Sequence, residues 1–199
     1  VMKNLKFIFL LLLFSCINLE TSNMSEGTEK AYFGGGCFWC MEPPFEVLDG
    51  VIEATSGYMG GETENPTYEE VCTGKTGHAE AVKISYDETK ITLSELLKIF
   101  FKTHDPTTRN RQGNDTGTQY RSVIFYDDEN QLNFLEDYIE TLDSSDTYNT
   151  KIVTTLEKKT EFFIAEEYHH NYFEKNPFNG YCNVIVRPKV EKFRKQYKS

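Results

Sequence analysis

The chain has 199 residues, of which 39% are hydrophobic and 14% are aromatic. This composition supports a packed core and excludes a disordered protein, and the length predicts one domain with or without appendages. The balance of 21 Lys and Arg against 31 Asp and Glu gives a net charge of -10, and no basic cluster compensates for it. General nucleic-acid binding, which needs a basic surface, is therefore not expected.

Residues 1–16 have the pattern of a targeting segment. Two lysines precede the apolar run Phe7–Phe14, which is too short to span a bilayer stably. The run ends in Leu-Phe-Ser-Cys, which resembles a bacterial lipobox and predicts a lipidated Cys16 in an exported protein, anchored in the periplasm or at the cell surface. An ordinary secretory signal or an uncleaved anchor is the alternative. Residues 17–29 are polar and predict a flexible tether before a domain over residues 30–199.

The elements expected along the domain alternate between strands and helices. Ala31–Phe33 predicts a short strand, and after three glycines a helix is expected over Met41–Leu48. Thr92 and Glu95 have the spacing of a capping box ahead of the helical repeat Leu93–Phe101. Other patterns predict strands over 51–58, 79–86, 121–126 and 151–156, helices over 129–142 and 165–175, a polar loop over 105–118, and mixed signals from 181 onward. This alternation indicates the α+β or α/β class.

The segment Gly34–Cys40 (Gly-Gly-Gly-Cys-Phe-Trp-Cys) holds two of the five cysteines and the only tryptophan. Glycines between a strand and a helix let the backbone approach a ligand, and a helix N-terminus favours the thiolate form of Cys37. Phe38 and Trp39 can wall an apolar pocket beside that sulfur. The C-x-x-C pair with Cys40 fits a thioredoxin-like redox pair, half a zinc site, or a nucleophile with a partner thiol. Zinc is the least favoured, because the other cysteines and the adjacent histidines lack ligand spacing.

Two polar segments offer further candidates for chemistry. Glu80 lies in an apolar strand pattern, where burial would raise its pKa and let it hold a proton, although an ion pair with Lys or Arg is the alternative. Asp115 and Tyr120 belong to a dense polar run entering a strand. They could bind an amine and donate a hydrogen bond, or simply form a turn.

Three more residues in other segments are candidates for the site or for the core. Tyr68 is either a pocket phenol or ordinary packing. Cys72 is expected to be a small buried residue. Cys182 lies on an expected late loop, where it is either a mobile partner thiol or an idle surface cysteine.

Several motifs then occur in one order along the chain. They are Gly-Cys-Phe-Trp-Cys, Asn-Pro-Thr-Tyr, Gly-His-Ala-Glu-Ala-Val, His-Asp-Pro, Gly-Asn-Asp-x-Gly-Thr-Gln-Tyr-Arg-Ser and Tyr-His-His-x-Tyr-Phe. Together they resemble the A-type peptide methionine sulfoxide reductases over about residues 31–198. The resemblance implies an α+β fold with a central mixed sheet flanked by helices, in a ferredoxin-like sandwich, and neither a metal nor a bound organic cofactor.

The resemblance also implies reduction of the S epimer of methionine sulfoxide, free or in proteins, to methionine. The family's nucleophile matches Cys37 and its active-site glutamate matches Glu80. Its pocket tyrosines match Tyr68 and Tyr120, and its substrate-holding aspartate matches Asp115. The chemistry agrees, because a sulfoxide oxygen is a poor leaving group until it is protonated, and a neutral buried carboxyl supplies that proton.

The remaining roles concern substrate fit and recycling. The aromatic pair that receives the substrate methyl matches Phe38 and Trp39. Turnover leaves a sulfenic acid on Cys37, which a second thiol converts to a disulfide. That resolving thiol matches Cys182 in some members of the family and Cys40 in others; Cys182 is preferred here, and a relay between the two pairs stays open. The expected reductant is thioredoxin or a thioredoxin-like protein, tethered to the membrane if the enzyme is exported, and the chain is expected to be a monomer.

Two other functions remain as alternatives. A general thiol–disulfide oxidoreductase would use Cys37 and Cys40 and would not need Glu80. A lipid-anchored binding module would recognise methionine sulfoxide or apolar peptides without turnover, so its binding would survive Cys37→Ser.

Overall fold

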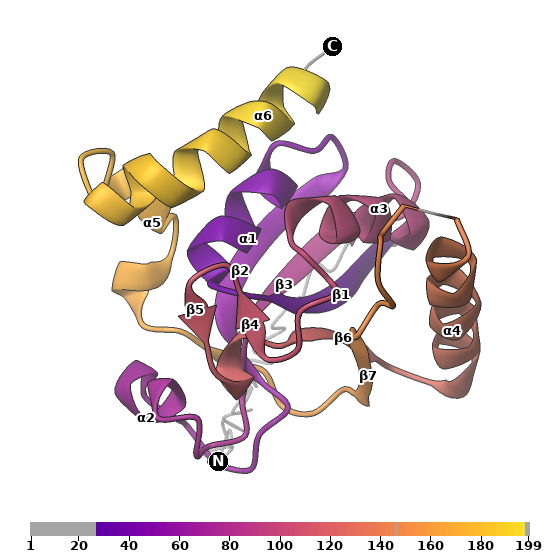
Figure 1. Cartoon of the computed structure of the whole chain (residues 1–199), viewed down its shortest axis with the longest axis horizontal. Coiled ribbons are helices and arrows are strands. Elements are labelled where there is room, and N and C mark those ends of the chain that lie inside the picture. Colours follow the sequence, from indigo (N-terminus) through magenta and orange to yellow (C-terminus); the bar gives the residue numbers. More distant parts are fainter. Residues whose placement is uncertain (1–26, 146, 198–199) are drawn as a thin grey trace, which may run out of the picture.

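Six strands form one mixed sheet in the order β7-β6-β1-β3-β2-β8 (Figure 1). The structure, a computed structural model, describes residues 27–145 and 147–197. Strands β6 and β7 run parallel, and the other neighbouring pairs are antiparallel. The strands are β1 (Thr28–Gly35), β2 (Val51–Met59), β3 (Ala79–Asp87), β6 (Ser122–Tyr126), β7 (Thr155–Lys158) and β8 (Phe163–Ile164), while β4 (Arg111–Gln112) and β5 (Asp115–Thr116) form a separate ribbon.

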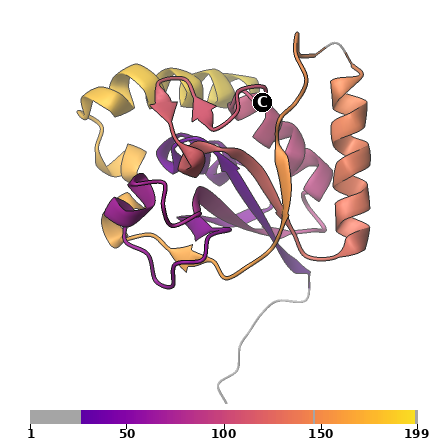
Figure 2. The ribbon, with the colours of Figure 1, turned by 60° about the horizontal axis from the view of Figure 1, so that its bottom comes forward.

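The helices gather mainly on one face of the sheet. The α-helices are α1 (Phe38–Glu46), α2 (Tyr68–Cys72), α3 (Leu93–Thr103), α4 (Glu129–Asp143), α5 (Tyr172–Lys175) and α6 (Arg187–Tyr197). Shorter elements are the 3-10 turns η1 (Thr118–Tyr120) and η2 (Glu167–His169) and the π-helical turn η3 (Cys182–Val186). Helix α6 lies across α1 in Figure 1, and Figure 2 shows α4 beside the β6–β7 edge.

Alternation along the strands divides the apolar residues between the two faces of the sheet. Phe33 faces the helices and packs against Phe100 of α3, with ring centroids 4.9 Å apart. Its neighbour Tyr32 faces the opposite side, in a smaller cluster that Phe162 covers at 5.6 Å. The larger core therefore lies beneath α1 and α3, so the start of α1 is set against the middle of the sheet.

Most of the predicted elements are confirmed, and so is the α+β class with a mixed sheet flanked by helices. The capping box at Thr92 is present: its hydroxyl accepts from the Glu95 N–H, and the Glu95 carboxylate accepts from the Thr92 N–H at 2.8 Å. The expected loop over 105–118 contains the β4–β5 ribbon, and the tail from Cys182 is helical.

Two predicted elements are wrong. The strand expected over 151–156 begins only at Thr155, because the Ile152 N–H donates to the Asp143 carboxylate and the Val153 N–H donates to a loop carbonyl instead of to the sheet. The helix expected over 165–175 is broken at Asn171, whose left-handed backbone (φ 53°) separates η2 from α5.

The targeting segment, Cys16 and most of the expected tether lie outside the described residues. The last two residues of the predicted tether belong to β1, which starts at Thr28 and pairs with Asp87. Among the described residues, no helix is both long and apolar enough to cross a membrane.

Candidate active site

Cys37 lies where β1 turns into α1, at the middle of the sheet. Gly36 has a φ of 96°, and a Cβ at this position would come within 2.6 Å of the Gln112 side chain, so only glycine fits. Cys37 is the N-cap of α1 with an extended backbone, and its carbonyl accepts from the Cys40 N–H at 2.9 Å. The predicted glycine turn and the position of Cys37 at a helix start are confirmed.

Glu80 is buried beside this helix start. It belongs to β3, is 1% exposed, and accepts a hydrogen bond from the Phe38 N–H on Oε2 at 3.1 Å. Burial raises the pKa of Glu80 to about 8, and the charge of Asp115 adds to the rise. Its other oxygen, Oε1, is buried and has no hydrogen-bond partner within the described part of the chain. Glu80 is thus a neutral carboxyl at pH 7 with one oxygen unused, which fits a proton donor and not an ion pair.

Two tyrosines flank this carboxyl. Tyr68 is the first residue of α2 and Tyr120 the last of η1. Burial raises the pKa of both phenols, and the neighbouring Glu80 charge raises them further. Both phenols therefore keep their protons and can donate hydrogen bonds to an oxygen placed between them and Glu80.

Asp115 reaches the site through a tyrosine that the sequence did not single out. Its Oδ2 accepts from the Tyr181 hydroxyl at 2.9 Å, and that hydroxyl lies 3.9 Å from the Cys40 sulfur. Burial raises the pKa of Tyr181, with the nearby Cys37 as the next cause. Asp115 therefore holds a phenol beside the thiols, and its charge also acts on Glu80.

The expectation that Cys37 rests as a thiolate is wrong. A hydrogen bond with the Cys40 thiol, burial and the negative charge of Glu80 together raise the pKa of Cys37 well above its ordinary value. A backbone hydrogen bond in the first turn of α1 lowers it, but by less. The thiol is thus protonated before substrate arrives, because the site around the helix start is more apolar and more acidic than the helix terminus alone suggests.

An aromatic cage surrounds the residues after Cys37. Phe38 is buried with its ring 6.4 Å from Tyr68 and 4.9 Å from His169, measured between centroids. Trp39 donates from Nε1 to Nδ1 of His169 at 3.0 Å and stacks on Tyr172 at 3.7 Å with the rings 5° apart. The apolar surroundings that Phe38 and Trp39 are expected to give Cys37 are therefore present, and residues far along the chain complete them. A pocket at this place stays a prediction.

Three cysteines lie near one another, and their burial increases from Cys37 through Cys40 to Cys182. The Cys37 and Cys40 thiols share a hydrogen bond within the first turn of α1, and Cys40 packs in an apolar cluster with Cys182. The reading of Cys182 as a residue on a late loop is wrong: it is 0% exposed and begins η3. Its burial follows from an i, i+4 stripe with Val186 and Val190 that packs against α1.

Cys72 is exposed, so the expectation of a buried residue is also wrong. It ends α2, and the buried position on that short helix is taken by Val71. The Tyr68 phenol donates its hydrogen bond to the Cys72 thiol at the edge of the site, so it must turn away from this thiol to donate to another acceptor.

A model of the family described as peptide methionine sulfoxide reductase matches residues 29–199. Among curated proteins, a peptide methionine sulfoxide reductase MsrA of Natronomonas pharaonis is 52% identical over 170 residues, covering 85% of this chain and 96% of that protein. The chain belongs to the peptide methionine sulfoxide reductase family. It is accordingly an oxidoreductase that acts on methionine sulfoxide.

Solved structures of this family share the fold. Mxr1 from Saccharomyces cerevisiae in reduced form is 37% identical with a TM-score of 0.73, covering 78% of this chain and 90% of that one. The same yeast protein in complex with Trx2 is 27% identical with a TM-score of 0.54, covering 77% and 91%.

The methionine sulfoxide reductase site also contains a carboxylate that sequence reasoning missed. Glu166 accepts from the Tyr58 hydroxyl and from the Tyr68 N–H, both at 2.8 Å, and its Oε2 lies 3.7 Å from Nε2 of His169. Burial acts to raise the pKa of Glu166, but these hydrogen bonds outweigh it and lower the pKa. Glu166 lies two residues after the end of β8 and two residues before the Tyr-His-His motif. Its nearness to that motif is the one signal in the sequence that points to it.

Within the described residues, no group of three or more His, Cys, Asp or Glu side chains is arranged to hold a metal ion. The polar atoms that converge on the site belong instead to a carboxyl, phenols and thiols.

Proposed function

We propose that this protein reduces the S epimer of methionine sulfoxide, free or in proteins, with Cys37 as nucleophile and Glu80 as acid. The observation that carries the proposal is the neutral, buried Glu80 carboxyl next to the Cys37 helix start, with Oε1 unbonded in the described structure. Thiol–disulfide exchange does not require such an acid, because a thiolate leaves without protonation, whereas loss of the sulfoxide oxygen requires one.

In the proposed first step, the Cys37 sulfur attacks the sulfoxide sulfur while Glu80 donates its proton to the sulfoxide oxygen. The proton of the Cys37 thiol returns to Glu80, so the carboxyl ends the step as it began. The sulfur–oxygen bond of the substrate breaks as the hydroxyl is transferred to Cys37. The sulfur–sulfur bond made by the attack breaks with its electron pair going to the substrate sulfur, so methionine leaves and Cys37 is a sulfenic acid. Tyr68 and Tyr120 donate hydrogen bonds to the oxygen as its charge grows.

The aromatic cage accounts for the choice of epimer in this proposal. A sulfoxide sulfur is chiral, so fixing its methyl group and its oxygen also fixes which face meets Cys37. We assign the methyl to the pocket of Phe38 and Trp39 and the oxygen to Glu80. The opposite epimer would then direct its oxygen or its lone pair wrongly.

We further propose that Cys40 resolves the sulfenic acid first. The Cys40 thiol attacks the Cys37 sulfur, a disulfide forms, and water leaves. Cys182 then attacks the Cys40 sulfur, which releases Cys37 as a thiol and leaves a Cys40–Cys182 disulfide. The hydrogen bond between Cys37 and Cys40 and the packing of Cys182 on Cys40 support this order. It revises the preference for Cys182 as the direct partner.

An external dithiol must reduce the last disulfide. We propose thioredoxin or a thioredoxin-like protein, and the complex of the yeast relative with Trx2 supports this choice. The lipobox-like pattern ending at Cys16 supports an exported, lipid-anchored enzyme, which would need a reductant outside the cytoplasm. Radiolabelled fatty acid incorporated by the wild type but not by Cys16→Ala would support the anchor, and equal labelling would contradict it.

The function is tested by single-turnover reduction of each epimer without a reductant. Methionine should form from the S epimer and not from the R epimer, and Cys37→Ser should form none. In Cys40→Ser we expect a sulfenic acid on Cys37 that dimedone traps, because Cys182 does not reach it directly. A Cys37–Cys182 disulfide in that variant would contradict the proposed order, and no methionine from either epimer would contradict the function itself.

A further inference from the structure

Glu42 is a buried carboxylate that the proposed chemistry does not use. It lies in α1, is 2% exposed, and accepts hydrogen bonds on both oxygens. Oε1 accepts from the backbone N–H of Asn171 at 2.9 Å, and Oε2 accepts from the Ser56 hydroxyl of β2. Burial raises the pKa of Glu42, and the two hydrogen bonds oppose that rise. The carboxylate therefore joins α1 to a turn located about 130 residues later in the chain.

The turn bonded by Glu42 separates two residues that contact Trp39. His169 ends η2 and accepts the indole N–H of Trp39, and Tyr172 begins α5 and stacks on the indole ring. Asn171 lies between them with a left-handed backbone (φ 53°, ψ 34°). The position of this one residue thus sets the direction of both contacts.

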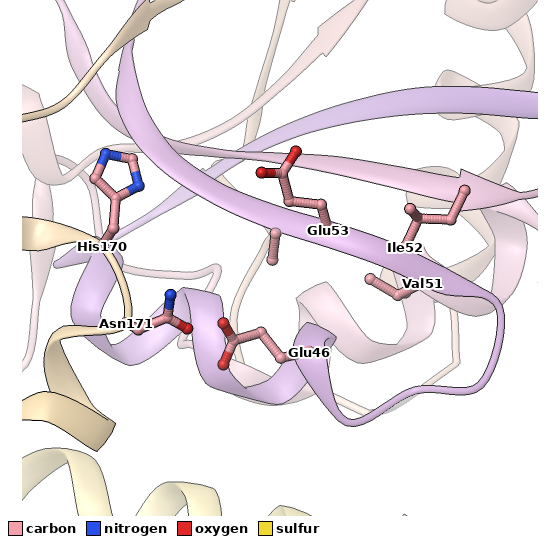
Figure 3. A pocket seen from close by; sticks show the side chains of 7 residues that line it. Glu46, Val51, Ile52, Glu53, His170 and Asn171 are labelled. Carbon is pink, nitrogen blue, oxygen red and sulfur yellow. The ribbon is translucent and has the colours of Figure 1, made fainter. Parts of the chain in front are cut away.

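One side of the turn is not held by packing. Asn171 and His170 border a pocket of about 290 Å³ that also meets the end of α1 and the first half of β2 (Figure 3). Hydrogen bonds fix the turn instead, from Asn171 to Glu42 and between His170 Nε2 and the Ala165 carbonyl at 2.7 Å. The Asn171 bond joins the middle of the turn to α1, the helix that begins after Cys37 and carries Trp39, and adds to the contacts that His169 and Tyr172 make with Trp39.

We propose that Glu42 is a positioning residue for the sulfoxide pocket: its bond to the Asn171 N–H holds His169 and Tyr172 against Trp39. The proposal rests on the assignment of Trp39 to the substrate methyl site. Glu42 does not touch the substrate; it acts through the turn. Loss of the bond should therefore weaken substrate binding more than it slows the chemical step.

Glu42→Leu removes both acceptors at nearly constant size, whereas Glu42→Gln keeps an oxygen for the Asn171 N–H and an amide that Ser56 can accept from. We expect KM for the S sulfoxide to rise about tenfold in Glu42→Leu with kcat changed less than about twofold, and both to stay near wild type in Glu42→Gln. Trp39 is the only tryptophan, so acrylamide quenching of its fluorescence reports the cage without any turnover. Quenching should increase in Glu42→Leu alone.

Ser56→Ala is the matched control, because it removes the second bond of Glu42 and leaves the bond to Asn171. It should leave KM and quenching at wild-type values. Wild-type KM and quenching in Glu42→Leu, or equal changes in Ser56→Ala, would overturn the proposal. If Glu42→Leu does not fold, Glu42→Asp, whose carboxylate is one methylene too short, must show the increased quenching. The quenching measurement stands even if the sulfoxide is not the substrate, so failure of this proposal and failure of the proposed function are separable.

Discussion

At the scale of single residues, both of the groups that we propose to react are held in their protonated forms. Burial holds Glu80 neutral up to about pH 8, and the same surroundings hold Cys37 as a thiol. A free thiolate would be open to oxidants at all times, whereas this pair becomes reactive when a sulfoxide oxygen is there to take the proton. The negative charge that each group would place on the other is the physical link between them.

The acid role of Glu80 predicts a pH dependence. The carboxyl donates only while protonated, so kcat/KM for the S sulfoxide should be level near pH 7 and fall as the pH rises through about 8. Glu80→Gln cannot donate a proton, and its kcat/KM should be lower by about 10²- to 10⁴-fold with that fall absent. Stopped-flow methionine formation across the pH range measures both. A variant within a few-fold of wild type would remove Glu80 from the mechanism.

The sequence could predict only part of this arrangement. Cys37 and Glu80 stand in motifs whose composition already indicates a thiol beside a helix start and an acid in an apolar strand. Tyr181 and His169 could not be assigned, because their roles depend on hydrogen bonds to residues 66 and 130 positions away. The resting state of Cys37 is also not predictable from the helix terminus, because that signal is local, whereas burial and the charge of Glu80 depend on the folded structure.

At the scale of elements, α2 and α3 begin with the same capping box, but α3 contributes to the core whereas α2 contributes a tyrosine to the site. Thr92 and Glu95 cap α3, whose apolar side is buried in the core. Thr67 and Glu70 cap α2, a five-residue helix that begins with Tyr68. Because the two caps are chemically alike, a different effect of their removal on activity would reflect where each helix lies in the fold.

Alanine at either cap should cost about 1 kcal/mol of stability, but only one should affect activity. Thr67→Ala loosens the turn that presents Tyr68, so kcat/KM for the sulfoxide should fall several-fold. Thr92→Ala should leave kcat/KM unchanged, since α3 touches the site only through the core. Urea unfolding and steady-state kinetics on both variants test the pair. Equal kinetic losses in the two would mean that stability, and not the position of α2, controls the rate.

Local signals predicted the elements that are bounded by strong caps or long apolar repeats, such as α3 and β3. They failed where tertiary hydrogen bonds decide the backbone. The apparent helix over 165–175 is interrupted because the Asn171 N–H bonds to Glu42 in α1 and not to a carbonyl one turn earlier. Nothing near Asn171 in the sequence records that distant partner.

At the scale of the whole molecule, the sheet carries Glu80 into the middle of the fold, where ionisation is costly. Its neighbour across the β2–β3 ladder is Tyr58, which is fully buried. The acid is therefore maintained by the packing of the entire domain and not by one partner, and any change in that packing changes its pKa. Ionisation of Glu80 in turn affects the stability of the fold, because a group whose pKa differs between the folded and unfolded states makes stability depend on pH.

The pKa of Glu80 rises from 4.5 to about 8 on folding. Between these values the unfolded chain releases the proton and the folded chain keeps it. The contribution of Glu80 to the free energy of unfolding is therefore complete below about pH 4.5 and is lost as the pH rises through about 8.

The Glu80→Gln variant tests this dependence, because glutamine never ionises and the variant should not lose stability in this pH range. Its free energy of unfolding, relative to wild type, should therefore increase by about 5 kcal/mol from below pH 4.5 to above pH 8. Urea titrations at a series of pH values measure the free energy of unfolding of both proteins. The contributions of the other titrating groups cancel in the difference between variant and wild type. Glu161→Gln, the same substitution at an exposed position, is the matched control. A Glu80→Gln curve parallel to wild type would mean that Glu80 ionises freely in the folded protein, and the acid role would lose its physical basis.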